Sequence, residues 1–211
     1  MTDISLTDLV DYVGKVGTPK LTHARNLLTR DEYSPEKDHY RRLRMGIQEY
    51  HKGGGTDKKE LDKIITGLTD PKKHDSHRAC VSGYKKWLGR KTYEYFAPPF
   101  EHWAQGDVNV RVNPELGLKI GDTNHVVKLY FKSAPLKKSY ADLILSLMGD
   151  ALGAPASDTE YSVLDVRRRK LFSTATPDAA LMPLVAGEAA SLSTIWAKLP
   201  CLLYTSPSPR D

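Results

Sequence analysis

DVNVRVNPELGLKIGDTNHVVKLYFK, residues 107–132, is the longest run of the chain in which apolar and polar side chains alternate. Its apolar members are Val108, Val110, Val112, Leu116, Leu118, Ile120, Val127, Leu129 and Phe131. Alternation of this kind is typical of strands that bury one face. The sequence therefore predicts a β-sheet over residues 107–132, with its apolar side turned to a core.

A hairpin is predicted in the second half of this run, because GDTN at 121–124 supplies turn residues. With the second and third of these residues at the tip, Leu118 lies opposite Val127. Leu116 then lies opposite Leu129, so the apolar faces of the two strands coincide.

The opposite face of the predicted hairpin is polar. Pro114 has no N–H to donate, which favours a strand start, an edge or a bulge and places Glu115 at a bend. The face gathers one carboxylate, three cations and a phenol: Glu115, Lys119, Lys128, Tyr130 and Lys132. A cross-strand ion pair on a solvated surface is one interpretation of this set, and a functional site is the other.

Residues 1–92 are predicted to be helical, since apolar residues recur at spacings of three and four. Ser5 and Asp8 match a capping box ahead of the first helix, and Gly17 is predicted to end that helix. Further starts are marked by an N-cap residue, in three cases before a proline: Thr18-Pro19, Ser34-Pro35, Thr56 and Asp70-Pro71. Five helices are expected in this region.

Residues 93–200 are predicted to hold the sheet and further helices. An aromatic-rich connector over 93–106 should be buried rather than extended in solvent. After the hairpin the pattern predicts a helix over 141–152, a strand over 161–166, a turn at 167–170 and an amphipathic helix after Pro183. The predicted fold class is α+β, with a helical N-terminal region packed on a small mixed β-sheet with flanking helices.

The last residues, CLLYTSPSPRD (201–211), resemble the in-frame translation of a transposase-type sequencing adapter. We expect this segment to be non-native, from a metagenomic read that lost its true C-terminus. The segment contains one arginine and one aspartate, so the formal net charge of +5 stays the same without it.

Composition narrows the class of protein. Apart from Cys201 the chain has one cysteine, Cys80, which excludes a disulfide framework and a thiolate metal site. The N-terminus lacks the pattern of a signal peptide, and no apolar run is expected to reach membrane-spanning length. A cytoplasmic protein with no membrane partner is therefore predicted, and the basic balance is compatible with a polyanionic partner.

The order of these elements resembles the core of the PD-(D/E)XK nuclease superfamily over roughly residues 94–173. Pro114-Glu115 matches the PD element, and Tyr130-Phe131-Lys132 lies where the (D/E)XK triplet lies. The resemblance implies Glu115 as a ligand of a divalent metal, Mg²⁺ if the nuclease is active, and Lys132 as the residue that activates water. Lys128, on the same polar face, is grouped with this catalytic set.

The chain departs from the superfamily pattern at Tyr130, which occupies the position of the second acid. A phenol that ionises near pH 10 is a poor ligand for Mg²⁺. Glu94, Glu101 or Asp165 are the alternative sources of a second carboxylate. The sequence therefore leaves open whether the protein is an enzyme, and a degenerate, inactive core is the expectation.

Basic residues form three clusters that could contact the phosphates of DNA or RNA. They are Lys85, Lys86, Arg90 and Lys91; Lys128, Lys132, Lys137 and Lys138; and Arg167, Arg168 and Arg169, followed by Lys170. A nucleic-acid-binding protein with a nuclease-like core is one prediction. A non-catalytic protein-interaction or structural domain is the alternative, and the sequence does not predict the oligomeric state.

Overall fold

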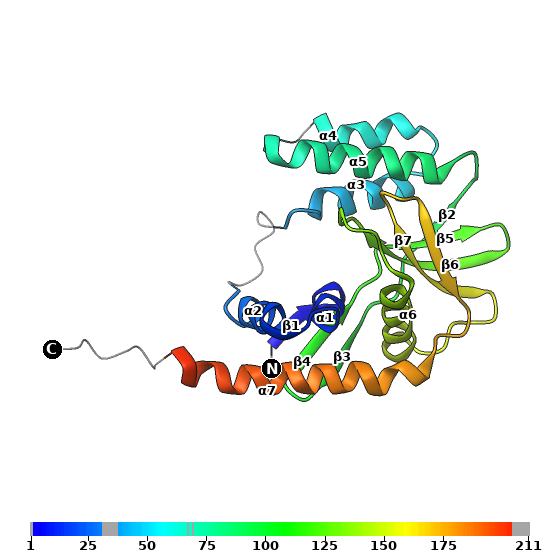
Figure 1. The fold of residues 1–211 in the computed structure, drawn as a ribbon. Helices are drawn as coiled ribbons and strands as arrows, with labels where there is room; N and C mark the ends of the chain where they lie inside the picture. Colours follow the sequence, from blue (N-terminus) through cyan, green and yellow to red (C-terminus); the bar gives the residue numbers. More distant parts are fainter. Residues whose placement is uncertain (1, 31–37, 67, 69, 204–211) are drawn as a thin grey trace.

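A computed structural model of the chain describes residues 2–30, 38–66, 68 and 70–203. The described helices are α1 (Leu6–Val13), α2 (Gly17–Leu28), α3 (Arg41–Lys52), α4 (Lys63–Thr66), α5 (Pro71–Leu88), α6 (Lys138–Leu152) and α7 (Met182–Leu203), with 3-10 turns η1 (Lys58–Asp62) and η2 (Ala179–Leu181). The strands are β1 (Thr2–Ser5), β2 (Glu94–Phe96), β3 (Glu101–Gln105), β4 (Val108–Val112), β5 (Leu116–Ile120), β6 (Thr123–Tyr130), β7 (Thr159–Asp165) and β8 (Lys170–Thr174). The α+β class is confirmed (Figure 1).

The strands form two sheets. A three-stranded sheet has the order β1-β4-β3, with β1 parallel to β4. A five-stranded mixed sheet has the order β2-β5-β6-β7-β8, and its parallel pair, β6 and β7, is connected through α6. The alternating run thus contributes to both sheets, because the chain leaves the first sheet after β4 and enters the second at β5. Pro114 lies in this crossing, where no ladder N–H is required.

The hairpin of β5 and β6 is present, but its predicted register is wrong by two residues. Leu116 pairs with Val127, and Leu118 pairs with His125. The tip is Gly121-Asp122, and Gly121 has a positive φ of 64°, which suits the first residue of a tight hairpin turn. A shift of two residues leaves every side chain on its original face. Leu116, Leu118, Val127 and Leu129 are therefore still buried, and Ile120 is partly buried.

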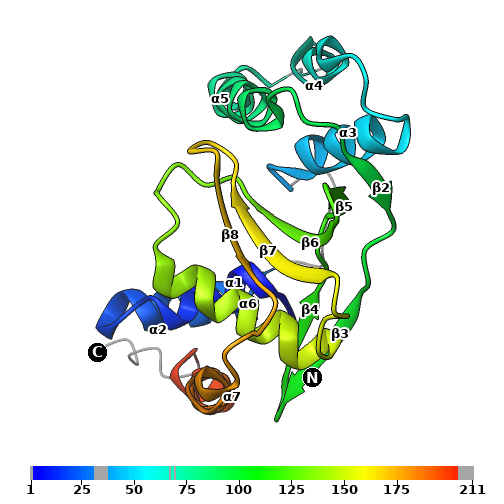
Figure 2. The same cartoon turned by 90° about the vertical axis from the view of Figure 1, so that its right-hand side faces the viewer.

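Two hydrophobic cores lie on opposite faces of the five-stranded sheet. Neighbouring residues of β6 alternate between them, Val126 in the first core and Val127 in the second. In Figures 1 and 2, α3, α4 and α5 lie together on one side of this sheet, and α1, α2, α6 and α7 lie on the other. The helices of residues 1–92 are thus divided between the two cores.

The capping signals in the sequence predicted some helix starts correctly and placed others one or two residues away. The capping box of Ser5 and Asp8 is confirmed, with the Ser5 hydroxyl accepting from the Asp8 N–H at 3.1 Å. The other details differ, since α1 is capped by Gly14, Gly17 begins α2 after Val16, and Asp57 rather than Thr56 caps η1. Ser34-Pro35 lies outside the described residues. The strand β1 was not predicted, because four residues carry too little periodicity.

The connector over 93–106 contains two short strands, β2 and β3, and its aromatic residues are buried unevenly. Trp103 is buried and donates its indole N–H to Asp150 at 2.8 Å. Phe100, in contrast, is 53% exposed, so the expectation of burial is wrong for this residue.

Helix α7 corrects the expectation that no apolar run reaches membrane-spanning length. The stretch from Ala179 to Leu199, which comprises η2 and most of α7, is long and apolar enough to cross a membrane by length and composition, and 22% of its most apolar window is buried in the structure. A core helix of a globular protein passes the same test, so this observation alone assigns no membrane role. Residues 204–211 of the adapter-like segment lie outside the described residues.

The contact between α5 and the end of β7 depends on a glycine. A Cβ at Gly83 would lie 2.3 Å from the Val166 carbonyl oxygen, whereas a Cβ at Gly187 in α7 would meet nothing within 4 Å. We expect Gly83→Ala to destabilise the protein by about 1–3 kcal/mol, because backbone atoms must move apart. Gly187→Ala should stabilise it by roughly 0.5–1 kcal/mol, because alanine favours a helix interior. Urea unfolding of both variants tests this contrast, and equal effects of the two would contradict the close packing.

Candidate functional site

A row of polar side chains follows β6 on the sheet face that also packs against α6; we call it the polar row. It consists of Glu115, Lys128, Tyr130, Asp165, Lys132 and Asp11. Lys128 and Tyr130 share one face of β6, and Asp165 is the partner of Tyr130 across the parallel pair. The row ends at the carboxyl ends of β6 and β7, where Asp11 approaches from α1.

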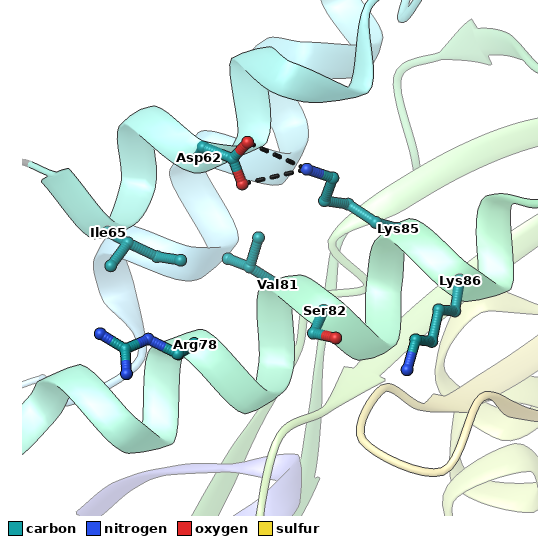
Figure 3. A pocket seen from close by; sticks show the side chains of 7 residues that line it. All are labelled: Asp62, Ile65, Arg78, Val81, Ser82, Lys85 and Lys86. Atoms are coloured by element: carbon teal, nitrogen blue, oxygen red, sulfur yellow. Dashed lines mark hydrogen bonds and ion pairs between the residues drawn. The ribbon is translucent and has the colours of Figure 1, made fainter.

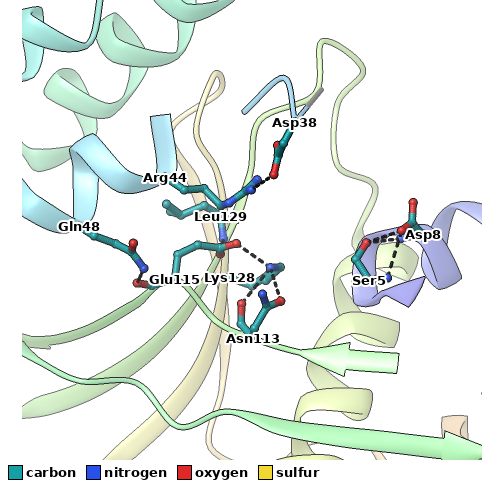
Figure 4. A network of polar contacts seen from close by, with 9 residues as sticks. All are labelled: Ser5, Asp8, Asp38, Arg44, Gln48, Asn113, Glu115, Lys128 and Leu129. Atoms are coloured by element: carbon teal, nitrogen blue, oxygen red, sulfur yellow. Dashed lines mark hydrogen bonds and ion pairs between the residues drawn. The ribbon is translucent and has the colours of Figure 1, made fainter. Parts of the chain in front are cut away.

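Glu115 and Lys128 form an ion pair that is buried rather than solvated. Their carboxylate oxygen and ammonium nitrogen lie 2.6 Å apart, and the two residues are 5% and 7% exposed (Figure 4). Lys128 also donates to the backbone carbonyl and the side chain of Asn113, at 3.0 and 3.3 Å. The charges therefore neutralise each other inside the protein, which corrects the interpretation of a solvated surface pair.

The second carboxylate oxygen of Glu115 takes the place of a missing backbone acceptor at the end of the β5–β6 pairing. It accepts the backbone N–H of Leu129 at 2.7 Å, just beyond the last backbone bond between the two strands, from the Glu115 N–H to the Val127 carbonyl. Because the chain turns away at Pro114, the Leu129 N–H has lost the strand beside it, and a buried N–H needs an acceptor. Both carboxylate oxygens of Glu115 are thus occupied by protein donors. The side-chain amide of Gln48, in α3, donates to the backbone carbonyl of Glu115 at 2.8 Å and so also holds this residue in place.

This arrangement does not fit a Mg²⁺ ion at Glu115. Such an ion needs oxygen ligands that are available to coordinate it, and the Glu115 carboxylate is held by an ammonium group and an amide. Across the described part of the chain, no group of three or more His, Cys, Asp or Glu residues could hold a metal ion. Among the alternative acids, Asp165 does join the polar row, about 7 Å further along β6. Glu94 and Glu101 lie on β2 and β3 and are exposed.

Both carboxylate oxygens of Asp165, at the carboxyl end of β7, accept hydrogen bonds from backbone N–H groups. One of its oxygens accepts the Leu136 N–H at 3.0 Å, and the other accepts the Arg168 N–H at 3.1 Å. The residue is 1% exposed. It therefore ties the segment after β6 to the turn after β7.

Lys132, the predicted water activator, forms an ion pair with Asp11 of α1. Each of these two side chains is about one-third exposed, so this end of the polar row reaches solvent. Tyr130 lies between the buried and the exposed ends. Burial raises the pKa of its phenol, and the carboxylates of Asp11 and Asp165 raise it further. Tyr130 is therefore a neutral phenol at physiological pH.

Two of the three basic clusters meet where β6 and β7 end. Arg167 donates to the Phe131 carbonyl at 2.8 Å and to the Ser76 hydroxyl of α5 at 2.7 Å. Arg168 donates to the Ser133 carbonyl at 2.6 Å, which joins the turn after β7 to the segment that leads into α6. The exposed cations gathered here are Lys137, Lys138, Arg168, Arg169 and Lys170, which we call the basic edge.

The residues of the remaining basic cluster, Lys85, Lys86, Arg90 and Lys91, do not form one surface. Lys85 is paired with both carboxylate oxygens of Asp62 at 3.0 Å. Lys86 follows Gly83 by one helical turn and so lies on the side of α5 that approaches the turn after β7. Arg90 and Lys91 lie past the end of α5. Lys91 is close enough to His125, near the start of β6, to help burial lower the pKa of that imidazole.

Sequence reasoning missed Asp11, Asn113, Ser76 and Gly83 as parts of this region. Each acts through a contact with a residue distant in the chain, and no local spacing signals such a contact. No protein-family model matches the chain, and no curated protein matches it either. The site is therefore interpreted from its own chemistry.

Proposed function

We propose that the protein binds nucleic acid, DNA or RNA, through the basic edge and does not cleave it at Glu115. The observation that carries the proposal is the convergence of two basic segments, 137–138 and 168–170, at one end of the parallel strands. Lys138 is paired with Asp142 at 2.7 Å and Arg168 lies 3.7 Å from Asp165, but all five cations of the basic edge are exposed to solvent, where they can contact successive phosphates of a nucleic-acid backbone. On this proposal the protein works in the cytoplasm, where such partners are present.

The non-catalytic part of the proposal rests on the polar row. A metal-dependent nuclease needs carboxylates that hold the metal in open coordination. In the polar row the charge of Glu115 is cancelled by Lys128, and that of Asp11 by Lys132. The resemblance to the PD-(D/E)XK core is thus proposed to reflect a nuclease-like scaffold used for binding.

The test is the salt dependence of binding to labelled single-stranded DNA, double-stranded DNA and RNA, followed by fluorescence anisotropy. We expect replacement of Arg168, Arg169 and Lys170 by glutamine to flatten the slope of log K against log salt by about 0.7–0.9 per lost phosphate contact. Glutamine is chosen because Arg169 has a positive φ of 61°, and glutamine and arginine carry a similar strain there.

The matched control removes three exposed cations from the opposite end of the sheet, by replacing Arg90, Lys91 and Lys119 with glutamine. This triple variant should keep the wild-type slope. If both triple variants flatten the salt slope equally, binding depends on net charge alone and not on the basic edge. If the wild type does not bind at low salt, a protein-interaction or structural domain is favoured. Cleavage with Mg²⁺ or Mn²⁺ that disappears in Glu115→Gln and Lys132→Ala would contradict the non-catalytic part of the proposal.

A further inference from the structure

A pocket of about 340 Å³ lies between α5 and the α4 region, away from the polar row (Figure 3). One wall is a single face of α5, on which the lining residues recur every three to four positions. The other wall is formed by Asp62 and Ile65. The α5 residues in the lining are Arg78, Val81, Ser82, Lys85 and Lys86.

The charges of this pocket do not cancel. Asp62 is paired with Lys85, which leaves Arg78 and Lys86 as the remaining cations of the lining. Arg78 forms a long ion pair with the fully exposed carboxylate of Asp75, at 3.9 Å on the same helix, which solvent screens. No ion pair or hydrogen bond engages the Lys86 ammonium within the described ranges of the chain. Two positive charges are therefore available to a ligand.

The spacing of these residues suits one tetrahedral anion. Arg78, Ser82 and Lys86 are four residues apart in sequence, so Ser82 lies about 6 Å along the helix from each cation. Lys86 extends close to Ser82, whereas Arg78 points away from it (Figure 3), so the exposed Arg78 side chain must rotate to reach a group seated at the Ser82 hydroxyl. A phosphate monoester carries a charge of about −1.5 to −2 at neutral pH, which matches the two cations.

The remaining lining points to an ester rather than to free phosphate. The pocket falls at the small end of the 300–1,000 Å³ range of sites for small organic ligands, and a bare phosphate would leave much of it empty. Ile65 supplies apolar surface beside the cations, and the largely buried Val81 lies beneath it. An uncharged organic group could cover this surface while the phosphate stays at Ser82.

We propose that the pocket between α4 and α5 binds a phosphate monoester, with the phosphate on Arg78, Ser82 and Lys86 and the organic group against Ile65 and Val81. The monoester could belong to a free nucleotide or to the terminal phosphate of a nucleic-acid strand. Both present the same chemistry. The pocket shares no residue with the basic edge, although Lys86 also lies toward the turn after β7.

The test is isothermal titration calorimetry of the full chain with adenosine 5′-monophosphate, adenosine and inorganic phosphate. The monophosphate should bind at least tenfold more tightly than either of the other two. Arg78→Gln with Lys86→Gln should weaken binding of the monophosphate at least tenfold, and Ser82→Asp should abolish it by like-charge repulsion. Arg90→Gln with Lys91→Gln, which removes the same charge beyond the end of α5, should leave the affinity unchanged.

A short oligonucleotide with and without a 5′-phosphate distinguishes the two sources. If the 5′-phosphate strengthens binding only when Arg78 and Lys86 are present, the ligand is a strand end. If it has no effect while the monophosphate still binds, the ligand is a free nucleotide. Equal affinity for adenosine and its monophosphate, or an unchanged affinity in the Arg78→Gln, Lys86→Gln variant, overturns the proposal.

One variant distinguishes failure of nucleic-acid binding at the basic edge from failure of monophosphate binding in the pocket. The variant with glutamine at positions 168, 169 and 170 should lose salt-dependent binding of oligonucleotides that lack a terminal phosphate, yet bind the monophosphate as wild type does. All substituted side chains are exposed, so thermal melting should confirm that every variant is folded.

Discussion

Leu118→Asp is expected to destabilise the protein by about 5 kcal/mol, enough to unfold a domain of ordinary stability. Leu118 is fully buried in the second core, so the substitution removes a packed side chain and brings a carboxylate into an apolar environment. Far-UV circular dichroism during urea unfolding measures the loss.

Leu184→Asp is the matched control, since Leu184 is 52% exposed in the first turn of α7. There an added carboxylate should change stability by less than about 0.5 kcal/mol, because the surface site is solvated and the helix N-terminus tolerates a negative charge. A melting curve of Leu118→Asp that matches that of Leu184→Asp would contradict the buried position of β5.

The observed register adds a second comparison. Leu118 faces His125, whose imidazole is a polar neighbour able to hydrogen-bond an introduced carboxylate, whereas the equally buried Leu116 faces Val127, which is apolar. Leu116→Asp should therefore be the more destabilising of the two aspartate variants. The reverse order would argue against this pairing of β5 with β6.

Lys128→Met is expected to cost about 3–5 kcal/mol, because it leaves the Glu115 carboxylate buried without a counter-ion. Urea unfolding of the variant and of the wild type measures the loss.

Two variants show whether burial causes this loss. Adding Glu115→Gln to Lys128→Met should recover most of the stability, because a neutral amide can still accept the Leu129 N–H. Lys138→Met removes a lysine paired with Asp142 at 2.7 Å, but Lys138 is largely exposed and the change should cost under about 1 kcal/mol. If the double variant is no more stable than Lys128→Met, the loss has another origin.

Local patterns in the sequence predicted local structure. The alternation around Val110 and Leu118 gave strands, the Ser5–Asp8 pair gave a helix start, and the spacing of Leu143 and Leu147 gave the helix α6. The hairpin tip was misplaced because GDTN contains more than one possible two-residue turn. A two-residue shift preserves the burial pattern, so the alternation cannot distinguish these registers.

The candidate site was predicted less well than the fold, for a physical reason. Alternation identifies a polar face but carries no information about what covers it. Glu115 and Lys128 were therefore expected in solvent, whereas the fold buries both of them. In the same way, Asp11 reaches Lys132 only because α1 and β6 become neighbours in the folded protein.

The pairing of β1 with β4 has a consequence for synthesis on the ribosome. Residues 2–5 leave the ribosome before their partners 108–111, which are synthesised 106 positions later. At roughly 5–20 residues per second, β1 and α1 therefore remain without β4 for several seconds, with the apolar side of α1 uncovered. The first sheet can close only after translation has passed β4, so ribosome-bound chains that stop before that strand should be sensitive to protease along α1.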